Sequence, residues 1–113
     1  MADLGTLDPR LVPWAKYLYS LGKQYDGRLV VTSARRSMAK QQRLYNDYLR
    51  GISKIPAAPP GRSLHQLGLA FDLARLGKDP LGDPLLNWLG AVWASWGGRW
   101  GGERDPVHFQ PSI

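Results

Sequence analysis

The most informative stretch of this sequence is Ser63-Leu64-His65-Gln66-Leu67-Gly68-Leu69-Ala70-Phe71-Asp72. From its second half to Ala74, large apolar side chains alternate with small or acidic ones, which is the period of two expected of a strand. Leu69, Phe71 and Leu73 would point to one face, and Asp72 with two alanines to the other. The small neighbours leave room for a bulky group to approach the carboxylate of Asp72.

The chain has two histidines, and each lies near a carboxylate in the sequence. His65 precedes Asp72 by seven residues, so a turn into the strand could aim both side chains at one point, and His108 follows Asp105 by three. Two imidazoles and one carboxylate, with a fourth position open, are the ligand set of a catalytic zinc that keeps a water. A carboxylate outside the coordination sphere can then serve as base toward that water.

From the residues alone a structural interpretation stays open, because a histidine beside a strand is more often an ordinary core or surface residue than a ligand. The absence of cysteine narrows the choices. It excludes disulfides, a thiolate zinc knuckle and a cysteine nucleophile. Any metal must therefore be held by histidines and carboxylates.

Local patterns around this stretch predict three helices and three strands. The first expected helix runs from its cap Asp8 to Leu21 and ends at Gly22, the second runs from Ser37 to about Arg50, and the third from Asp83-Pro84 to Gly97. The expected strands are Arg28–Ala34, Leu69–Ala74 and Val107–Gln110. This order predicts an α+β fold with about three helices and a small sheet.

The second helix and the loop after it carry further signals. Gln41 shares the apolar face of that helix with Leu44 and Tyr45, and it must find a hydrogen-bond partner there. We expect it to brace the neighbouring strand or loop. The segment Gly51–Arg62 contains three prolines and cannot be regular structure, and a loop of this length is more often functional than idle.

Length and composition set wider limits. A chain of 113 residues suits a single domain, and 43% hydrophobic residues with five tryptophans exclude a disordered chain. The net charge of +6 favours an anionic partner such as nucleic acid, anionic lipid or bacterial cell wall. The scattered lysines and arginines argue against nucleic acid. No apolar stretch approaches the roughly 20 residues that span a bilayer, so membrane insertion is not expected.

Three blocks of the sequence resemble one family. Ser-x-His-x-x-Gly-x-Ala-x-Asp at 63–72 and Asp-x-x-His-Phe at 105–109 are similar to the signature of the zinc D-Ala-D-Ala carboxypeptidase and L-alanyl-D-glutamate endopeptidase family, which shares its fold with the Hedgehog signalling domain. Upstream, Thr32–Ser37 followed by Gln41 and Leu44-Tyr45 resembles the family's Ser-Gly-Tyr-Arg-Ser segment and the glutamine behind it. Together the blocks cover most of the chain from Thr32 to Gln110.

This resemblance implies a small antiparallel sheet flanked by about three helices, with one zinc at the edge of the sheet, and it implies roles for particular residues. It makes His65, Asp72 and His108 the zinc ligands and Asp105 the general base. Asp105 stands where many relatives have glutamate, which is a longer side chain. No organic cofactor is implied.

The resemblance also implies a substrate site. Arg36, rather than Arg35, aligns with the arginine that binds a substrate carboxylate or the oxyanion, although Ala34-Arg35 replaces the family's Gly-Tyr. Ser63 aligns with a residue beside the substrate, and a turn-supporting role is the alternative. Gln41 is a further candidate for the substrate site, and Trp100, between glycines, could form the floor of a substrate groove.

The expected function is hydrolysis of the peptidoglycan stem peptide by a single zinc peptidase domain spanning residues 1–113. We place the cut between L-Ala and D-Glu, because the run Trp96–Gly102 leading into Asp105–Gln110 looks most like the short endopeptidase members. The alternatives are a D,D-carboxypeptidase of the same family and a non-catalytic zinc module of the same fold.

The expected setting follows from the start of the sequence. Met-Ala-Asp-Leu-Gly-Thr lacks the basic and apolar regions of a signal peptide, so we expect synthesis in a cytoplasm. With no recognisable wall-binding module, this suits a phage or prophage endolysin that reaches the cell wall after release. We expect it to act as a monomer.

Overall fold

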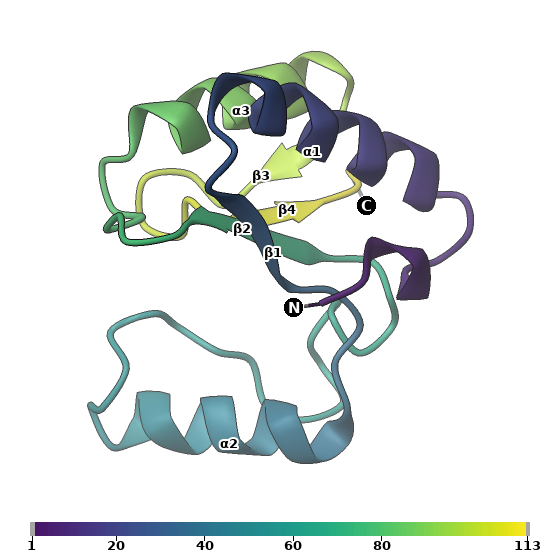
Figure 1. The fold of residues 1–113 in the computed structure, drawn as a ribbon. Coiled ribbons are helices and arrows are strands. Elements are labelled where there is room, and N and C mark those ends of the chain that lie inside the picture. Colours follow the sequence, from purple (N-terminus) through teal and green to yellow (C-terminus); the bar gives the residue numbers. More distant parts are fainter. Residues whose placement is uncertain (1, 113) are drawn as a thin grey trace.

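A four-stranded antiparallel sheet organises the structure, a computed structural model that describes residues 2–112 (Figure 1). Across the sheet the strands follow the order β1 (Leu29–Ser33), β2 (Phe71–Arg75), β4 (His108–Gln110) and β3 (Arg99–Trp100). The expected α+β fold with an antiparallel sheet is thus confirmed. The two-residue strand β3 at the edge was not expected.

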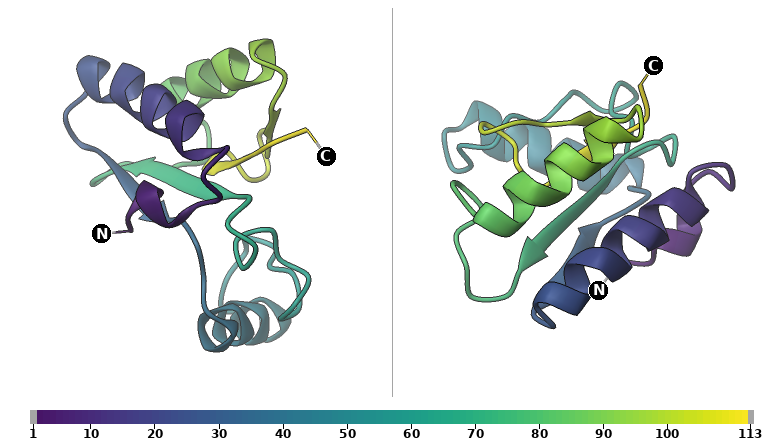
Figure 2. Two further views of the ribbon diagram at one scale, coloured as in Figure 1. Left: turned by 90° about the vertical axis from the view of Figure 1, so that its right-hand side faces the viewer. Right: turned by 90° about the horizontal axis from the view of Figure 1, so that it is seen from above.

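The helices divide between the two sides of the sheet. Figures 1 and 2 show α1 (Val12–Tyr25) and α3 (Pro84–Ser95) side by side over one face, whereas α2 (Met38–Leu49) and the loop after it lie on the other side. A short 3-10 helix, η1 (Leu4–Thr6), precedes α1. Within residues 2–112, no helix combines the length and the apolar character needed to cross a membrane.

The hydrophobic core lies between the sheet and the pair α1 and α3. Phe71 and Leu73 of β2 and Phe109 of β4 are fully buried there, and the rings of Phe71 and Phe109 stack with centroids 5.4 Å apart. Trp93 of α3 meets both rings edge-on. The expected alternation is confirmed for Phe71, Asp72 and Leu73, because Asp72 points to the opposite face, but the strand covers Phe71–Arg75 instead of Leu69–Ala74.

The first helix is shifted four residues toward the C-terminus from its expected range of Asp8–Leu21. Residues 8–11 form a turn in which Asp8 accepts backbone bonds from Leu11 and Val12, and Pro13 falls in the first helical turn, where it is tolerated. Gly22 does not end the helix. It is buried inside it, where a β-carbon would collide with Leu29 of the sheet.

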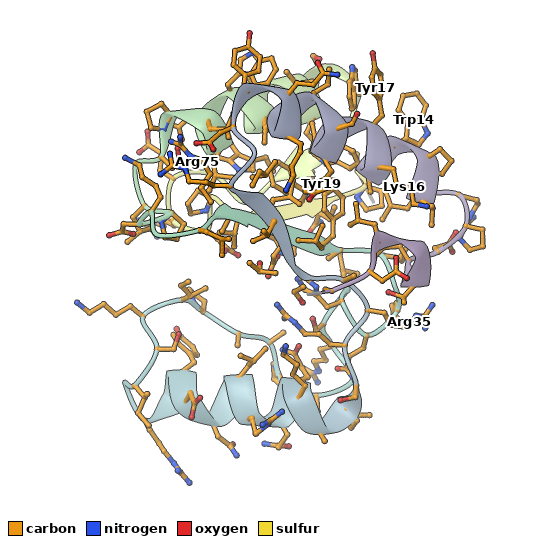
Figure 3. The ribbon with its side chains drawn as sticks, in the orientation of Figure 1. Trp14, Lys16, Tyr17, Tyr19, Arg35 and Arg75 are labelled. Carbon is orange, nitrogen blue, oxygen red and sulfur yellow. The ribbon has the colours of Figure 1, made fainter. Side chains whose placement is uncertain are left out.

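Fewer side chains of α1 are buried than its apolar sequence pattern predicts. Trp14, expected on the buried face, is 54% exposed, and Figure 3 shows it with Tyr17 on the outer side of the helix. Both rings contact Trp96 at the end of α3, with centroids 5.9 Å and 5.2 Å away. The residues that anchor α1 to the core are Leu11, Ala15 and Leu18.

The second helix begins as expected, because Ser37 caps it by accepting a hydrogen bond from the backbone of Lys40. Its expected apolar face is only partly covered, since Tyr48 and Leu49 are exposed. The reason is that α2 packs against a loop instead of the sheet. Gln41 is the one buried residue of this helix.

Charged groups join the far end of β2 to the two helices above it, near the label of Arg75 in Figure 3. Asp83 is fully buried, accepts a hydrogen bond from the backbone of Leu85 as cap of α3, and pairs with the Arg75 guanidinium. Arg75 also donates to Asp26, the C-cap of α1, at 3.0 Å. Burial opposes the charge of Asp83, but the bonds from Arg75 and Leu85 outweigh it and lower the pKa of Asp83.

We predict that Asp83→Ala destabilises the protein by about 3 kcal/mol, because it removes a helix cap and leaves Arg75 without its buried partner. Urea unfolding measures this, and the exposed Asp79→Ala serves as control. Since folding lowers the pKa of Asp83, the difference between wild type and variant should hold above about pH 4 and shrink as the pH falls through the folded-state pKa. Equal stability of Asp83→Ala and Asp79→Ala would contradict this account.

Candidate metal centre and active site

The candidate site lies on the face of the sheet opposite the core. Asp72 of β2 and His108 of β4 are partners across the two strands, which places their side chains next to each other on this face. His65 comes from the turn that leads into β2, where its side chain is buried. The structure therefore brings together the three residues that the sequence predicts as metal ligands.

The geometry of the three side chains suits a metal ion. Asp72 Oδ1 lies 3.2 Å from His65 Nε2 and 3.6 Å from His108 Nδ1, and one donor atom from each residue falls within 4.8 Å of the others. Among the described residues, Asp72 Oδ1 is the single buried side-chain polar atom without a hydrogen-bond partner. An unpartnered buried carboxylate oxygen is costly, and a cation would satisfy it.

Both histidines are held by the ring nitrogen that faces away from Asp72. His65 Nδ1 lies 3.0 Å from the carbonyl oxygen of Ala34, and His108 Nε2 lies 2.7 Å from Gln110 Oε1. Because both partners are acceptors, we assign the protons to these two nitrogens. The nitrogens facing Asp72 then keep their lone pairs, as metal ligation requires.

Arg36 holds the other oxygen of Asp72. Its Nη2 donates to Asp72 Oδ2 at 2.8 Å, its Nε to Ser33 Oγ at 2.8 Å and its Nη1 to Gln41 Oε1 at 3.2 Å. This arrangement fixes the carboxylate so that Oδ1 faces the histidines. Arg36 is thus placed as a support of the candidate ligand as well as near the cavity.

Arg35 lies elsewhere, as the sequence comparison of the two arginines implied. Its guanidinium sits beside η1, where Nε donates to the carbonyl of Thr6 at 3.1 Å, and Figure 3 shows it away from the sheet face. The two neighbouring arginines therefore point to different parts of the molecule, and only Arg36 reaches the cluster.

Gln41 and Ser63 make hydrogen bonds that hold the segments around the three candidate ligands in place. Gln41 is fully buried, and its Nε2 donates to the carbonyl of Ala58 at 2.7 Å, which confirms the expected bracing of the loop. Ser63 Oγ accepts a hydrogen bond from the backbone of His65 at 3.2 Å. Both residues line the cavity, but their bonds favour the turn-supporting interpretation of Ser63 and a positioning role for Gln41.

A cavity of about 240 Å³ opens beside the cluster, between the sheet and the loop after α2. Its walls include residues 55–58 and Arg62 on the loop side, and Asp105 with Gln110 on the sheet side. Asp105 can approach because the chain passes close to Gly101, where a β-carbon would collide with the Asp105 carbonyl. The predicted base and the predicted ligands therefore share one solvent-accessible space.

Burial and neighbouring charges shift the pKa values of the two carboxylates, Asp72 and Asp105, in opposite directions. Burial alone would raise the pKa of Asp72, but without a metal the two histidines, when protonated toward Asp72, and Arg36 outweigh it and hold that pKa well below its usual range. For Asp105, burial and the negative charge of Asp72 together raise the pKa. Asp72 is therefore kept as an anion, and Asp105 is the carboxylate more ready to hold a proton.

Trp100 does not line this cavity, which corrects its expected place at the floor of a substrate groove. Its ring packs against Gly90 of α3, where no side chain would fit, and its indole nitrogen donates to the carbonyl of Pro106 at 2.8 Å. The physical reason is β3, whose pairing with β4 turns Trp100 toward the helices.

Sequence reasoning missed two of the supporting residues. Ser33 is a bonding partner of Arg36, and Gln110 holds His108. Gln110 could have been found, because a residue two positions after a ligand on a strand lies on the same face. Ser33 could also have been found, because it lies three residues before Arg36 inside the Thr32–Ser37 block that resembles the family's Ser-Gly-Tyr-Arg-Ser segment.

Solved structures share this fold. VanYB in complex with D-alanine-D-alanine is 25% identical with a TM-score of 0.71, covering 93% of this chain and 71% of that chain. A mutant of the vancomycin resistance D,D-pentapeptidase VanY in complex with Zn(II) is 24% identical with a TM-score of 0.69, covering 93% and 72%. The L-Ala D-Glu endopeptidase ChiX of Serratia marcescens is 24% identical with a TM-score of 0.63, covering 96% and 83%.

Comparison with curated proteins finds no match. The family model for VanY, D-alanyl-D-alanine carboxypeptidase, matches residues 6–96. This range includes Arg36, His65 and Asp72, while Asp105 and His108 are joined to them by the fold. Because the match spans most of the sequence, the chain belongs to the VanY D-alanyl-D-alanine carboxypeptidase family.

Proposed function

We propose that this protein is a zinc-dependent peptidase that hydrolyses the stem peptide of peptidoglycan, with the cut between L-Ala and D-Glu. The observation that carries the proposal is the cluster of His65, Asp72 and His108 beside an open cavity, with one buried Asp72 oxygen lacking a partner. Membership of a peptidoglycan peptidase family agrees with it.

Zinc is the metal that this donor set suits. Two imidazole nitrogens and one carboxylate oxygen leave the fourth tetrahedral position open, as in catalytic zinc sites. In both histidines, the ring nitrogen that faces away from Asp72 makes a hydrogen bond, which fixes the ring orientation as metal-binding histidines require. The VanY mutant of the same fold was solved with Zn(II).

The chain's own residues supply the acid and base chemistry. When bound, zinc polarises a scissile carbonyl and lowers the pKa of water toward about 7. Asp105 then accepts the proton of the attacking water and delivers it to the leaving nitrogen. Its place on the cavity wall beside the three ligands suits both steps, and burial with the negative charge of Asp72 raises its pKa, which favours uptake of the proton.

Arg36 has two roles in the proposed reaction, as a positive charge near the substrate and as the residue that positions Asp72. Three of its five N–H groups are used by Ser33, Gln41 and Asp72, so two remain for negative charge that develops on the substrate. The same bonds keep Asp72 in place as a ligand.

The choice of bond depends on two kinds of support. The run from Gly97 to Gly102 before the Asp-x-x-His-Phe-Gln motif favours the endopeptidase, and ChiX matches 96% of this chain. The glycine-rich run does not line the cavity, so it contributes no wall for a longer substrate. The second candidate is a D,D-carboxypeptidase, which the family model and the VanYB complex favour.

We predict one zinc per chain, removable by chelators and bound at least about a hundredfold more weakly after Asp72→Ala, because two histidines alone are a poor site. Elemental analysis of protein refolded with zinc measures it. Asp79→Ala, which changes an exposed carboxylate, should keep full zinc content. Equal zinc in both variants would place the metal elsewhere.

We predict that Asp105→Ala keeps its zinc and its fold but loses about a hundredfold to ten-thousandfold in kcat, because it removes the proton acceptor. Turnover of a stem peptide and metal content are measured on the same sample. Glu103→Ala, two residues away and exposed, is the control. Loss of zinc together with activity would make Asp105 a ligand instead of a base.

The bond itself is tested by digesting purified peptidoglycan and identifying the products by mass spectrometry. We expect new N-terminal D-Glu on the released peptides, with L-Ala left on the glycan. Release of free D-Ala alone would establish the carboxypeptidase instead. Zinc-loaded protein that binds the wall without releasing products would show the non-catalytic module.

A further inference from the structure

The cavity beside the metal cluster is lined by two arginines with different surroundings. The guanidinium of Arg36 uses three of its five N–H groups to bind Asp72, Ser33 and Gln41. Arg62 is exposed, and within residues 2–112 its side chain makes no hydrogen bond or ion pair with another residue. Arg62 is thus a cation at the cavity wall that the fold itself does not neutralise.

The backbone that carries Arg62 is held in place. The backbone nitrogen of Arg62 donates to the carbonyl of Pro59 at 3.1 Å, closing a turn. At Gly61 the φ angle is +85°, and its nitrogen donates to Gln66 Oε1, while Gln41 binds the carbonyl of Ala58. These bonds present Arg62 at a defined position, three residues before the candidate ligand His65.

The carboxylates of the cavity do not need Arg62. Asp72 is already paired with Arg36, and the proposed reaction uses Asp105 as a proton acceptor, for which a bound arginine would be unfavourable. Other basic residues of α2 and its loop, such as Lys40, Arg43 and Arg50, are equally exposed but do not line the cavity. The position of Arg62, and not its charge alone, distinguishes it.

We infer that Arg62 binds the free α-carboxylate of the substrate's D-Glu and thereby selects for it. The inference rests on the proposed function. In the stem peptide D-Glu continues through its γ-carboxyl group, so its α-carboxylate stays free, close to the nitrogen of the scissile bond. A guanidinium matches a carboxylate with two parallel hydrogen bonds and suits this recognition.

The test compares two synthetic peptides, acetyl-L-Ala-γ-D-Glu-L-Lys and the same peptide with the D-Glu α-carboxylate converted to an amide. Wild-type zinc protein should cleave the carboxylate peptide about tenfold to a hundredfold more efficiently in kcat/KM. Arg62→Gln should lose this preference by slowing only the carboxylate peptide. Arg62→Lys, which keeps the charge without the fork of donors, should retain part of it.

Arg50→Gln is the matched control, since it removes an exposed arginine of the same region that does not line the cavity, and both peptides should be cleaved as by wild type. Zinc content and melting temperature show that each variant is folded. An equal effect of Arg62→Gln on both peptides, or no effect, would overturn the inference. If the zinc-loaded wild type cleaves neither peptide, the proposed function fails instead.

Discussion

The ion pair between Arg36 and Asp72 is the interaction on which the site depends. It crosses from the segment after β1 to β2, and it holds a buried carboxylate with one oxygen on the guanidinium and the other facing two histidines. A charged pair at this depth is stable only when its remaining hydrogen-bonding groups are satisfied. Ser33 and Gln41 accept two further hydrogen bonds from Arg36, and Asp72 Oδ1 is left for a cation.

Strand β2 links this chemistry to the folding of the protein. Its alternate residues Phe71 and Leu73 form the centre of the core, so the strand cannot slip by one residue without burying Asp72 among aromatic rings. The core therefore fixes the register that aims Asp72 at His108 across the sheet. The helices contribute to the site by stabilising the sheet from its other face.

On the side of the sheet that carries the candidate site, the structure is held by polar contacts instead of an apolar core. Helix α2 and its loop have little apolar core, and polar contacts such as Gln41 to Ala58 attach them to the sheet. This arrangement forms one wall of the cavity from loop residues, which can vary without disturbing the core.

The sequence by itself determined the two faces of β2, because alternation acts locally, and its resemblance to a known family identified the candidate ligands and the choice of Arg36 over Arg35. It could not place Trp100, the start of α1 or the partners of Arg36. Trp100 depends on β3 pairing with β4, and Asp72 meets Arg36 only because β2 pairs with β1, the strand that precedes Arg36. Such contacts join residues whose proximity no local period encodes, so only the tertiary structure decided them.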